Sequence, residues 1–130
     1  MDDLMIWEGC NDREGAEAGM QSGALTGSMR PTIVCLCGST RFKSEYEKAN
    51  RDETLKGNIV LSVGLFGHVE GLDMDGETKA MLDELHLRKI DLAHEVLILN
   101  PGGYIGESTT RELGYAVRKG KVIRSLEPLA

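Results

Sequence analysis

The sequence predicts a doubly wound α/β domain, in which a parallel sheet of four to five strands carries helices on both faces. Short apolar runs alternate with amphipathic stretches from Pro31 onward, and glycine or serine residues follow most of these runs. The runs 34–37 and 96–99 are continuously apolar, as expected for strands that are buried on both faces. This alternation favours parallel neighbours joined by right-handed crossovers.

Four strands and three helices account for the alternation. The predicted strands are 32–37, 58–63, 95–100 and 121–125, and the predicted helices are about 39–56, 77–93 and 108–119. Ser39 or Thr40 can cap the first helix, and Gly57 ends it. The stripes that we expect to face the sheet are Phe42, Tyr46 and Ala49, then Met81, Leu82, Leu85 and Leu92, and finally Leu113, Ala116 and Val117. This element order is that of a flavodoxin-like or Rossmann-like sheet.

Residues 1–30 differ from the rest of the chain. Five glycines recur there among acidic, serine and alanine residues, without a sustained apolar period. We therefore expect a flexible or loosely docked leader, followed by one domain over residues 31–130.

Composition and charge disfavour several classes of partner. The formal net charge of -6 argues against binding to a nucleic-acid polymer, because a polyanion needs a basic face. No apolar run approaches the roughly 20 residues of a membrane span, and no secretory signal is visible. The three cysteines lack metal-ligand spacing, so Cys35 and Cys37 are interpreted as small buried thiols. We expect a cytoplasmic protein with no metal, no organic cofactor and no membrane partner.

Two turns are the first candidates for ligand binding. They supply Gly38, Ser39 and Arg41 after the first strand, and Tyr104, Gly106 and Ser108 after the third. Both turns lie at the carboxyl edge of a parallel sheet, where free amides at helix N-termini can hold an anion. Ser39 and Arg41 suit a phosphate, although Ser39 could equally serve only as a cap while Arg41 is solvated. Tyr104 could stack on a base or pack over its own loop.

Two carboxylates are candidates for catalysis. Glu112 fits a capping box with Thr109, but a carboxylate in the first helical turn could also act as an ionised nucleophile. Asp91 is predicted near the C-terminus of its helix, where an acid opposes the helix dipole, and this misfit suggests a functional role, although a solvated surface aspartate is the alternative. His68 lies in the glycine-rich loop after the second strand and could contact a base or phosphate. His86 and His94 lack the spacing of a zinc site.

Several stretches together resemble the nucleoside 2-deoxyribosyltransferase superfamily. They are Cys-Gly-Ser-Thr-Arg at 37–41, Asp-Leu-Ala at 91–93, Arg-Glu-Leu-Gly-Tyr-Ala at 111–116 and Gly-Lys at 120–121. The resemblance covers about residues 31–126 in matching order. It is closest to the smaller members, the 2'-deoxynucleoside 5'-phosphate N-hydrolases and nucleotide N-glycosidases.

The resemblance implies a role for each matching residue. Glu112 would attack the anomeric carbon and form a covalent sugar ester, and Asp91 would bind the sugar or help to protonate the departing base. Ser39, Arg41 and Ser108 would contact the 5'-phosphate. A homo-oligomer in which a neighbour closes the site is also implied.

We therefore expect an enzyme that cleaves or transfers the N-glycosidic bond of a nucleoside or nucleotide. Two carboxylates at an oxocarbenium-like centre follow the logic of retaining glycosidases. The alternative is a nucleotide-binding or sensing module on the same fold, in which Glu112 is only a helix cap. The sequence leaves hydrolysis and transfer equally open.

Overall fold

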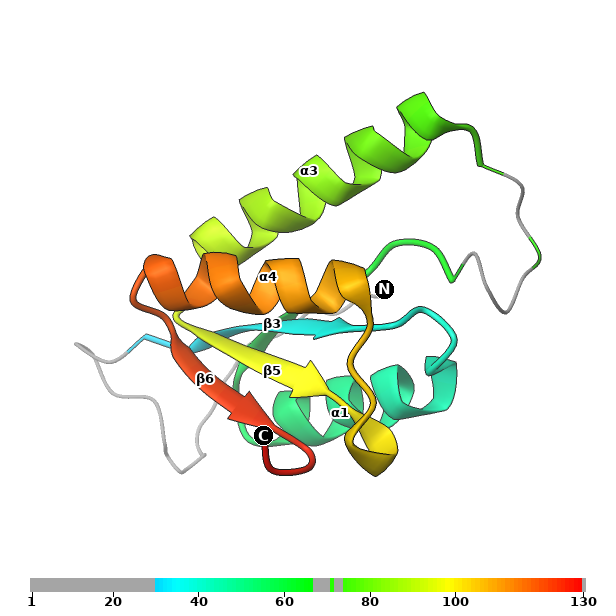
Figure 1. Ribbon diagram of the computed structural model, residues 1–130. Coiled ribbons are helices and arrows are strands. Elements are labelled where there is room, and N and C mark those ends of the chain that lie inside the picture. The colour runs from blue at the N-terminus through cyan, green and yellow to red at the C-terminus, as the bar shows by residue number, and fades with distance from the viewer. Residues whose placement is uncertain (1–29, 67–70, 72–73, 130) are drawn as a thin grey trace, which may run out of the picture. The chain divides into compact units, whose positions relative to one another are not determined.

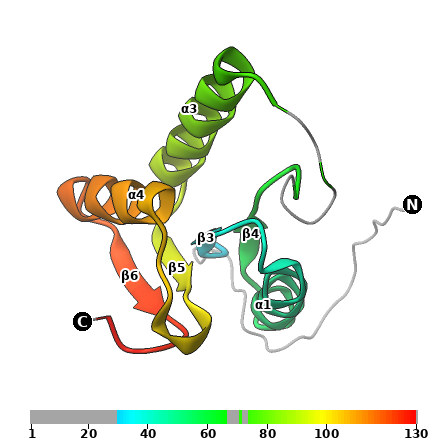
Figure 2. The same ribbon diagram turned by 45° about the vertical axis from the view of Figure 1, so that its right-hand side comes forward.

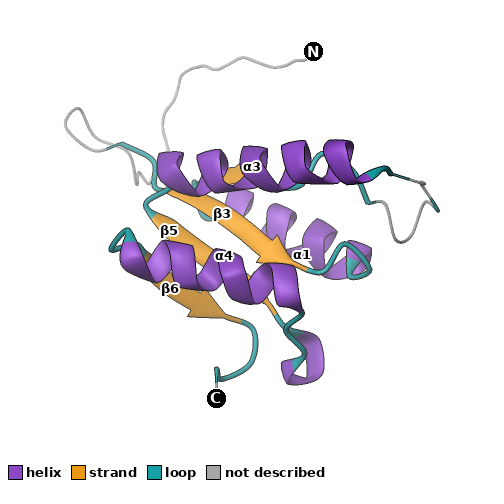
Figure 3. Cartoon of the chain, turned by 45° about the horizontal axis from the view of Figure 1, so that its top comes forward, coloured by secondary structure: helices purple, strands orange, loops and turns teal. Residues whose placement is uncertain are grey.

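Four parallel strands form the sheet on which the domain is built. The computed structural model describes residues 30–66, 71 and 74–129. The strands are β3 (Ile33–Gly38), β4 (Ile59–Leu61), β5 (Glu95–Leu99) and β6 (Val122–Ser125), in the spatial order β4-β3-β5-β6. All three neighbouring pairs are parallel, and Figure 3 shows β3, β5 and β6 running the same way. The structure thus confirms the predicted α/β class with a parallel sheet.

Helices cover both faces of this sheet. Helix α1 (Lys43–Leu55) lies against one face, and α3 (Gly76–Leu92) and α4 (Glu107–Arg118) lie against the other (Figures 1 and 2). A short 3-10 helix, η1 (Pro101–Gly103), follows β5. None of these helices is both long and apolar enough to cross a membrane.

The strand order creates a switch point between β3 and β5. The chain leaves β3 in one direction to form β4, and then returns past β3 to form β5 and β6. The loops after β3 and β5 therefore diverge at the carboxyl edge of the sheet, on opposite faces. In open α/β sheets a crevice at such a point is the usual place for a ligand.

The core is divided by the alternation of side chains along β3. Val34 and Leu36 join the cluster beneath α1, which also contains Tyr46. Cys35 and Cys37 face the opposite way and join the cluster beneath α3 and α4. All four of these β3 side chains are fully buried, so the strand is covered on both faces, as its continuous apolar run predicts.

A partly buried ion pair connects α1 to the edge strand β6. The guanidinium of Arg124 donates to both carboxylate oxygens of Glu53, at 2.8 and 3.1 Å, and its Nε donates to Glu95 at 3.0 Å. Asn58 donates a further bond of 2.9 Å to Glu53. Glu53 occupies the third buried position of α1, where an ordinary helix would carry an apolar residue.

The first helix begins later than predicted. Helix α1 starts at Lys43, its N-cap is Phe42, and no side chain caps it, so the predicted cap at Ser39 or Thr40 is wrong. Ser39 Oγ instead accepts a hydrogen bond of 3.3 Å from the backbone N–H of Arg41, which holds the chain in a turn before the helix. The predicted inward positions Tyr46 and Ala49 are confirmed as buried, whereas Phe42 is half-buried at the helix entrance.

Helices α3 and α4 turn partly different faces to the sheet from those predicted. Met81, Leu85 and Leu92 are 51%, 47% and 66% exposed, and the buried residues of α3 are instead His86 and Ile90. Figure 1 shows that the N-terminal half of α3 extends away from the sheet, so its apolar side chains there have no sheet to cover. On α4, Ala116 is buried as predicted and Leu113 packs against the core, but Val117 is 57% exposed.

Candidate functional site

A pocket of about 300 Å³ lies between α3 and α4. Asp83 and Leu87 line it from α3, and the α4 residues that line it include Ser108, Arg111, Glu112 and Tyr115. This volume is at the lower end of the range for small-molecule sites. Two of the predicted site residues, Ser108 and Glu112, therefore share one concave surface, and Tyr115 lines it beside them.

Glu112 is free of the capping role that its spacing suggested. Helix α4 starts at Glu107 with Gly106 as its N-cap, so the third helical position is Thr109 and the predicted capping box is wrong. The Glu112 side chain is only 15% exposed, and its Oε1 lies 3.9 Å from Nε2 of His86. Burial raises the pKa of Glu112, while the charge of His86 opposes this shift. Glu112 thus places a poorly hydrated carboxylate at the pocket wall, and this carboxylate does not cap the helix.

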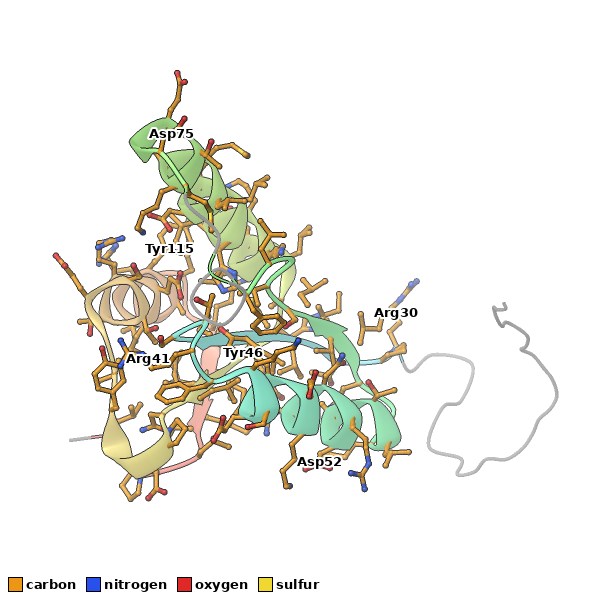
Figure 4. All side chains as sticks on the ribbon, turned by 90° about the vertical axis from the view of Figure 1, so that its right-hand side faces the viewer. Arg30, Arg41, Tyr46, Asp52, Asp75 and Tyr115 are labelled. Carbon is orange, nitrogen blue, oxygen red and sulfur yellow. The ribbon has the colours of Figure 1, made fainter. Side chains whose placement is uncertain are left out.

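Asp91 does not line the pocket and is connected to it only through Tyr115. Its Oδ1 accepts a hydrogen bond of 2.6 Å from the hydroxyl of Tyr115, and its Oδ2 lies 3.2 Å from Nη1 of Arg88. The hydrogen bond from Tyr115 lowers the pKa of Asp91. Asp91 is not among the residues that line the pocket, whereas Tyr115 lies between α3 and α4 (Figure 4). The structure therefore does not bring the carboxylates of Glu112 and Asp91 to the same surface.

A second group of predicted residues meets at the carboxyl edge of the sheet. Arg41 Nε donates to Ser39 Oγ at 3.2 Å, and its guanidinium carbon lies 4.9 Å from the centre of the Tyr104 ring. A Cβ added at Gly106 would lie 3.2 Å from the Tyr104 hydroxyl. We call Ser39, Arg41, Tyr104 and Gly106 the rim, because they join the loops after β3 and β5 (Figure 4 labels Arg41).

Gly38 has a packing reason to be glycine. A Cβ at this position would lie 2.8 Å from the carbonyl oxygen of Leu99 and 3.0 Å from its Cβ, both on the neighbouring strand. The Gly38 carbonyl oxygen accepts a hydrogen bond of 2.7 Å from the hydroxyl of Tyr46, and burial raises the pKa of that hydroxyl. Gly38 thus sets the close approach of β3 and β5. The predicted contact residue His68 and nearly all of the predicted leader lie outside the described residues.

Sequence reasoning did not foresee a thiol–imidazole cluster beneath the pocket. Sγ of Cys37 lies 3.2 Å from Nε2 of His86, and Sγ of Cys35 lies 3.8 Å from the same nitrogen. The hydrogen bond from Cys37 lowers the pKa of Cys35, and that bond together with burial raises the pKa of Cys37. Burial alone would lower the pKa of His86, but the bond to Cys35 and the charge of Glu112 raise it. The signal in the sequence was the Cys-x-Cys spacing, which places both thiols on one face of a strand.

The described residues thus form three features. They are the pocket with Ser108, Glu112 and Tyr115, the rim at the switch point, and the cluster of Cys35, Cys37 and His86 behind Glu112. When the chain is compared with known proteins, no family model matches it, and no curated protein matches it either.

Proposed function

We propose that this domain binds a nucleoside or nucleoside 5'-monophosphate and cleaves or transfers its N-glycosidic bond, with Glu112 as the nucleophile. The observation that carries this proposal is the position of Glu112: a mostly buried carboxylate on a pocket wall, released from any capping role. The resemblance in sequence to the nucleoside 2-deoxyribosyltransferase superfamily supports the same assignment.

The chemistry proceeds in two steps. A carboxylate oxygen of Glu112 attacks C1' of the sugar while the bond from C1' to the base nitrogen breaks, and the departing base takes up a proton from water. The sugar is then held as an ester of Glu112. Water releases it as free sugar in a hydrolase, and a second base releases it as a new nucleoside in a transferase. Poor hydration of Glu112 favours this attack, because little water must be removed from the carboxylate.

Asp91 enters this proposal as a positioning residue. Its carboxylate accepts the hydroxyl hydrogen of Tyr115, and the Tyr115 side chain lines the pocket one helical turn from Glu112. Asp91 thereby fixes the position of an aromatic wall against which a sugar or base can rest. Asp91 therefore acts through Tyr115 and does not touch the substrate.

We assign phosphate recognition to the start of α4 and to the rim. Gly106 is extended and offers no capping side chain, so the first-turn amides of α4 are not satisfied by a cap. Ser108 lies in that turn and lines the pocket. Arg41 adds a cation at the rim, where Tyr104 holds its guanidinium plane.

The same proposal includes assembly into a homo-oligomer. Met81, Leu85 and Leu92 lie on α3 at the spacing of one helical stripe, and each is about half exposed or more. Size-exclusion chromatography with light scattering tests this part, because a monomer would contradict it. The free thiols of Cys35 and Cys37 suit a reducing compartment, so the cytoplasm is the location that we propose.

A panel of ribo- and deoxyribonucleosides and their 5'-monophosphates tests the proposed reaction. Each compound is incubated with the protein, with and without a second base, and chromatography measures free or exchanged base. We expect product with wild type and with Glu107→Gln, since Glu107 is exposed, and a loss of at least roughly 1,000-fold with Glu112→Gln. Binding of a nucleotide without any base release or exchange would instead assign the domain as a binding or sensing module.

A further inference from the structure

Three atoms that can bind a metal ion converge behind Glu112. Sγ of Cys35, Sγ of Cys37 and Nε2 of His86 lie within 4.8 Å of one another, and all three residues are buried. The two thiols come from one face of β3, and the imidazole comes from α3. Glu112 Oε1 approaches the same imidazole nitrogen at 3.9 Å from α4.

This arrangement is not that of a cysteine nucleophile with a histidine base. In such a triad the acid holds the ring nitrogen that faces away from the thiol. Here the acid and both thiols surround one nitrogen, Nε2, which carries at most one proton and can donate to only one of them. Both thiols are also fully buried, so a substrate cannot reach them.

The spacing of the donors is that of ligands around a small cation. In a tetrahedral zinc site, Zn–S bonds of about 2.3 Å and Zn–N bonds of about 2.0 Å place sulfur and nitrogen roughly 3.5 Å apart. The two observed sulfur–nitrogen distances are 3.2 and 3.8 Å. Only small rotations of the side chains would therefore bring all three donors into ligand positions.

We propose that Cys35, Cys37 and His86 form a binding site for Zn²⁺ or a similar borderline-soft cation. Two thiolates and one imidazole select this class over Mg²⁺ and Ca²⁺, which prefer oxygen ligands. Binding displaces the thiol protons to solvent and leaves two thiolates that neutralise the cation. Glu112 approaches His86 and also lines the pocket, so we place the route of the ion on the pocket side. This inference goes beyond the proposed reaction and does not depend on it.

Cobalt titration of the full chain, freed of metal by a chelator, tests the site. We expect one Co²⁺ per chain, with a sulfur-to-cobalt charge-transfer band and the strong visible bands of tetrahedral cobalt. Zn²⁺ should displace both signals and raise the midpoint of thermal unfolding. Binding without the charge-transfer band, or no binding, would overturn the proposal.

Variants locate the site within the chain. Cys37→Ser and His86→Gln should weaken cobalt binding by roughly 100-fold or more. Even the loss of a residue that only hydrogen-bonds to a metal ligand lowers metal affinity by about 10- to 100-fold. Cys10→Ser, at the third cysteine of the sequence, should leave binding unchanged. If a core variant fails to fold, X-ray absorption of the wild-type zinc form decides instead: a shell of two sulfurs supports the site, and a shell of nitrogen and oxygen alone contradicts it. Glu112→Gln should still bind cobalt but should no longer release base. The metal site and the proposed reaction can therefore fail independently of each other in these experiments.

Discussion

The hydroxyl of Tyr115 donates a hydrogen bond of 2.6 Å to Asp91, and this contact joins α4 to the C-terminal turn of α3. Arg88 reinforces the junction, because it donates to the same hydroxyl at 3.1 Å and pairs with Asp91 at 3.2 Å. A polar network at the junction of α3 and α4 therefore holds Tyr115, one of the residues that line the pocket.

This junction predicts coupled effects of two substitutions. Tyr115→Phe and Asp91→Ala each remove one partner of the same bond, so the double variant should lose less stability than the sum of the two single losses. In the base-release assay each should reduce activity less than Glu112→Gln does, because neither removes the nucleophile. Urea unfolding of the four proteins measures the first effect. Additive losses would show that the two side chains act independently.

Replacing the proposed nucleophile should stabilise the protein. Burial disfavours the charge of Glu112, and a neutral amide of the same shape avoids that cost, so Glu112→Gln should raise the free energy of unfolding at pH 7 by roughly 0.5–1.5 kcal/mol. Urea unfolding at fixed temperature checks this value. A loss of stability would indicate that Glu112 is needed to hold the fold, which would count against its catalytic assignment.

The close approach of β3 to β5 should make Gly38 intolerant of a side chain. In Gly38→Ala the new Cβ would meet the backbone oxygen of Leu99 at 2.8 Å, so we expect a loss of about 1–3 kcal/mol in the free energy of unfolding. Gly64→Ala is the matched control, since a Cβ there meets nothing within 4 Å. Equal stability of the two variants would contradict the tight packing.

The ion pair between Glu53 and Arg124 should make stability depend on acid pH. The hydrogen bonds from Arg124 lower the pKa of Glu53 to about 2, below its ordinary value of 4.5. An acid with a lowered pKa contributes stability that is complete above pH 4.5 and lost as the pH falls towards 2. Glu53→Gln should therefore cost roughly 1–3 kcal/mol at pH 7 and progressively less below pH 4.5.

Unfolding midpoints of wild type and Glu53→Gln at several pH values test this dependence. Glu47→Gln, at an exposed position of the same helix, should match wild type throughout. A gap between wild type and Glu53→Gln that stays constant from pH 7 to pH 3 would rule out the ion pair as its source.

The rim should distinguish monophosphates from nucleosides. Arg41→Gln removes the cation that lies over Tyr104, and we expect KM to rise about tenfold for a 5'-monophosphate while the nucleoside value is unchanged. Arg51→Gln, at an exposed position on α1, is the control. If both substrates were affected equally, Arg41 would contribute to folding of the loop and not to phosphate recognition.

The sheet was predictable because its strands carry strong local signals. The continuous apolar runs at 34–37 and 96–99 lie within β3 and β5, and the parallel order follows from the helices between them. The helix faces were less predictable. Hydrophobic spacing assigned Met81 to the core because it assumes that a helix packs along its whole length, whereas the N-terminal half of α3 leaves the sheet. Leu85 and Leu92 are exposed because the C-terminal half of α3 turns His86 and Ile90 to the core instead.

The candidate site was predictable only where its residues are close in the chain. Ser39 and Arg41 share a turn, and Ser108 and Glu112 share a helix face, so local spacing could group them. Cys37 and His86 are 49 positions apart, and their contact depends on the rotation of α3 about its own axis. No local pattern encodes that rotation.

Because β3 is central in the sheet, its two faces become covered at different times during synthesis. This strand is synthesised first among those described, yet its second neighbour, β5, and the covering helix α4 come much later in the sequence. Until residue 118 has emerged, one face of β3 is incompletely covered and the sulfur atoms of Cys35 and Cys37 are open to oxidants. Both thiols are therefore more exposed to oxidants during synthesis than in the finished domain, where they are buried.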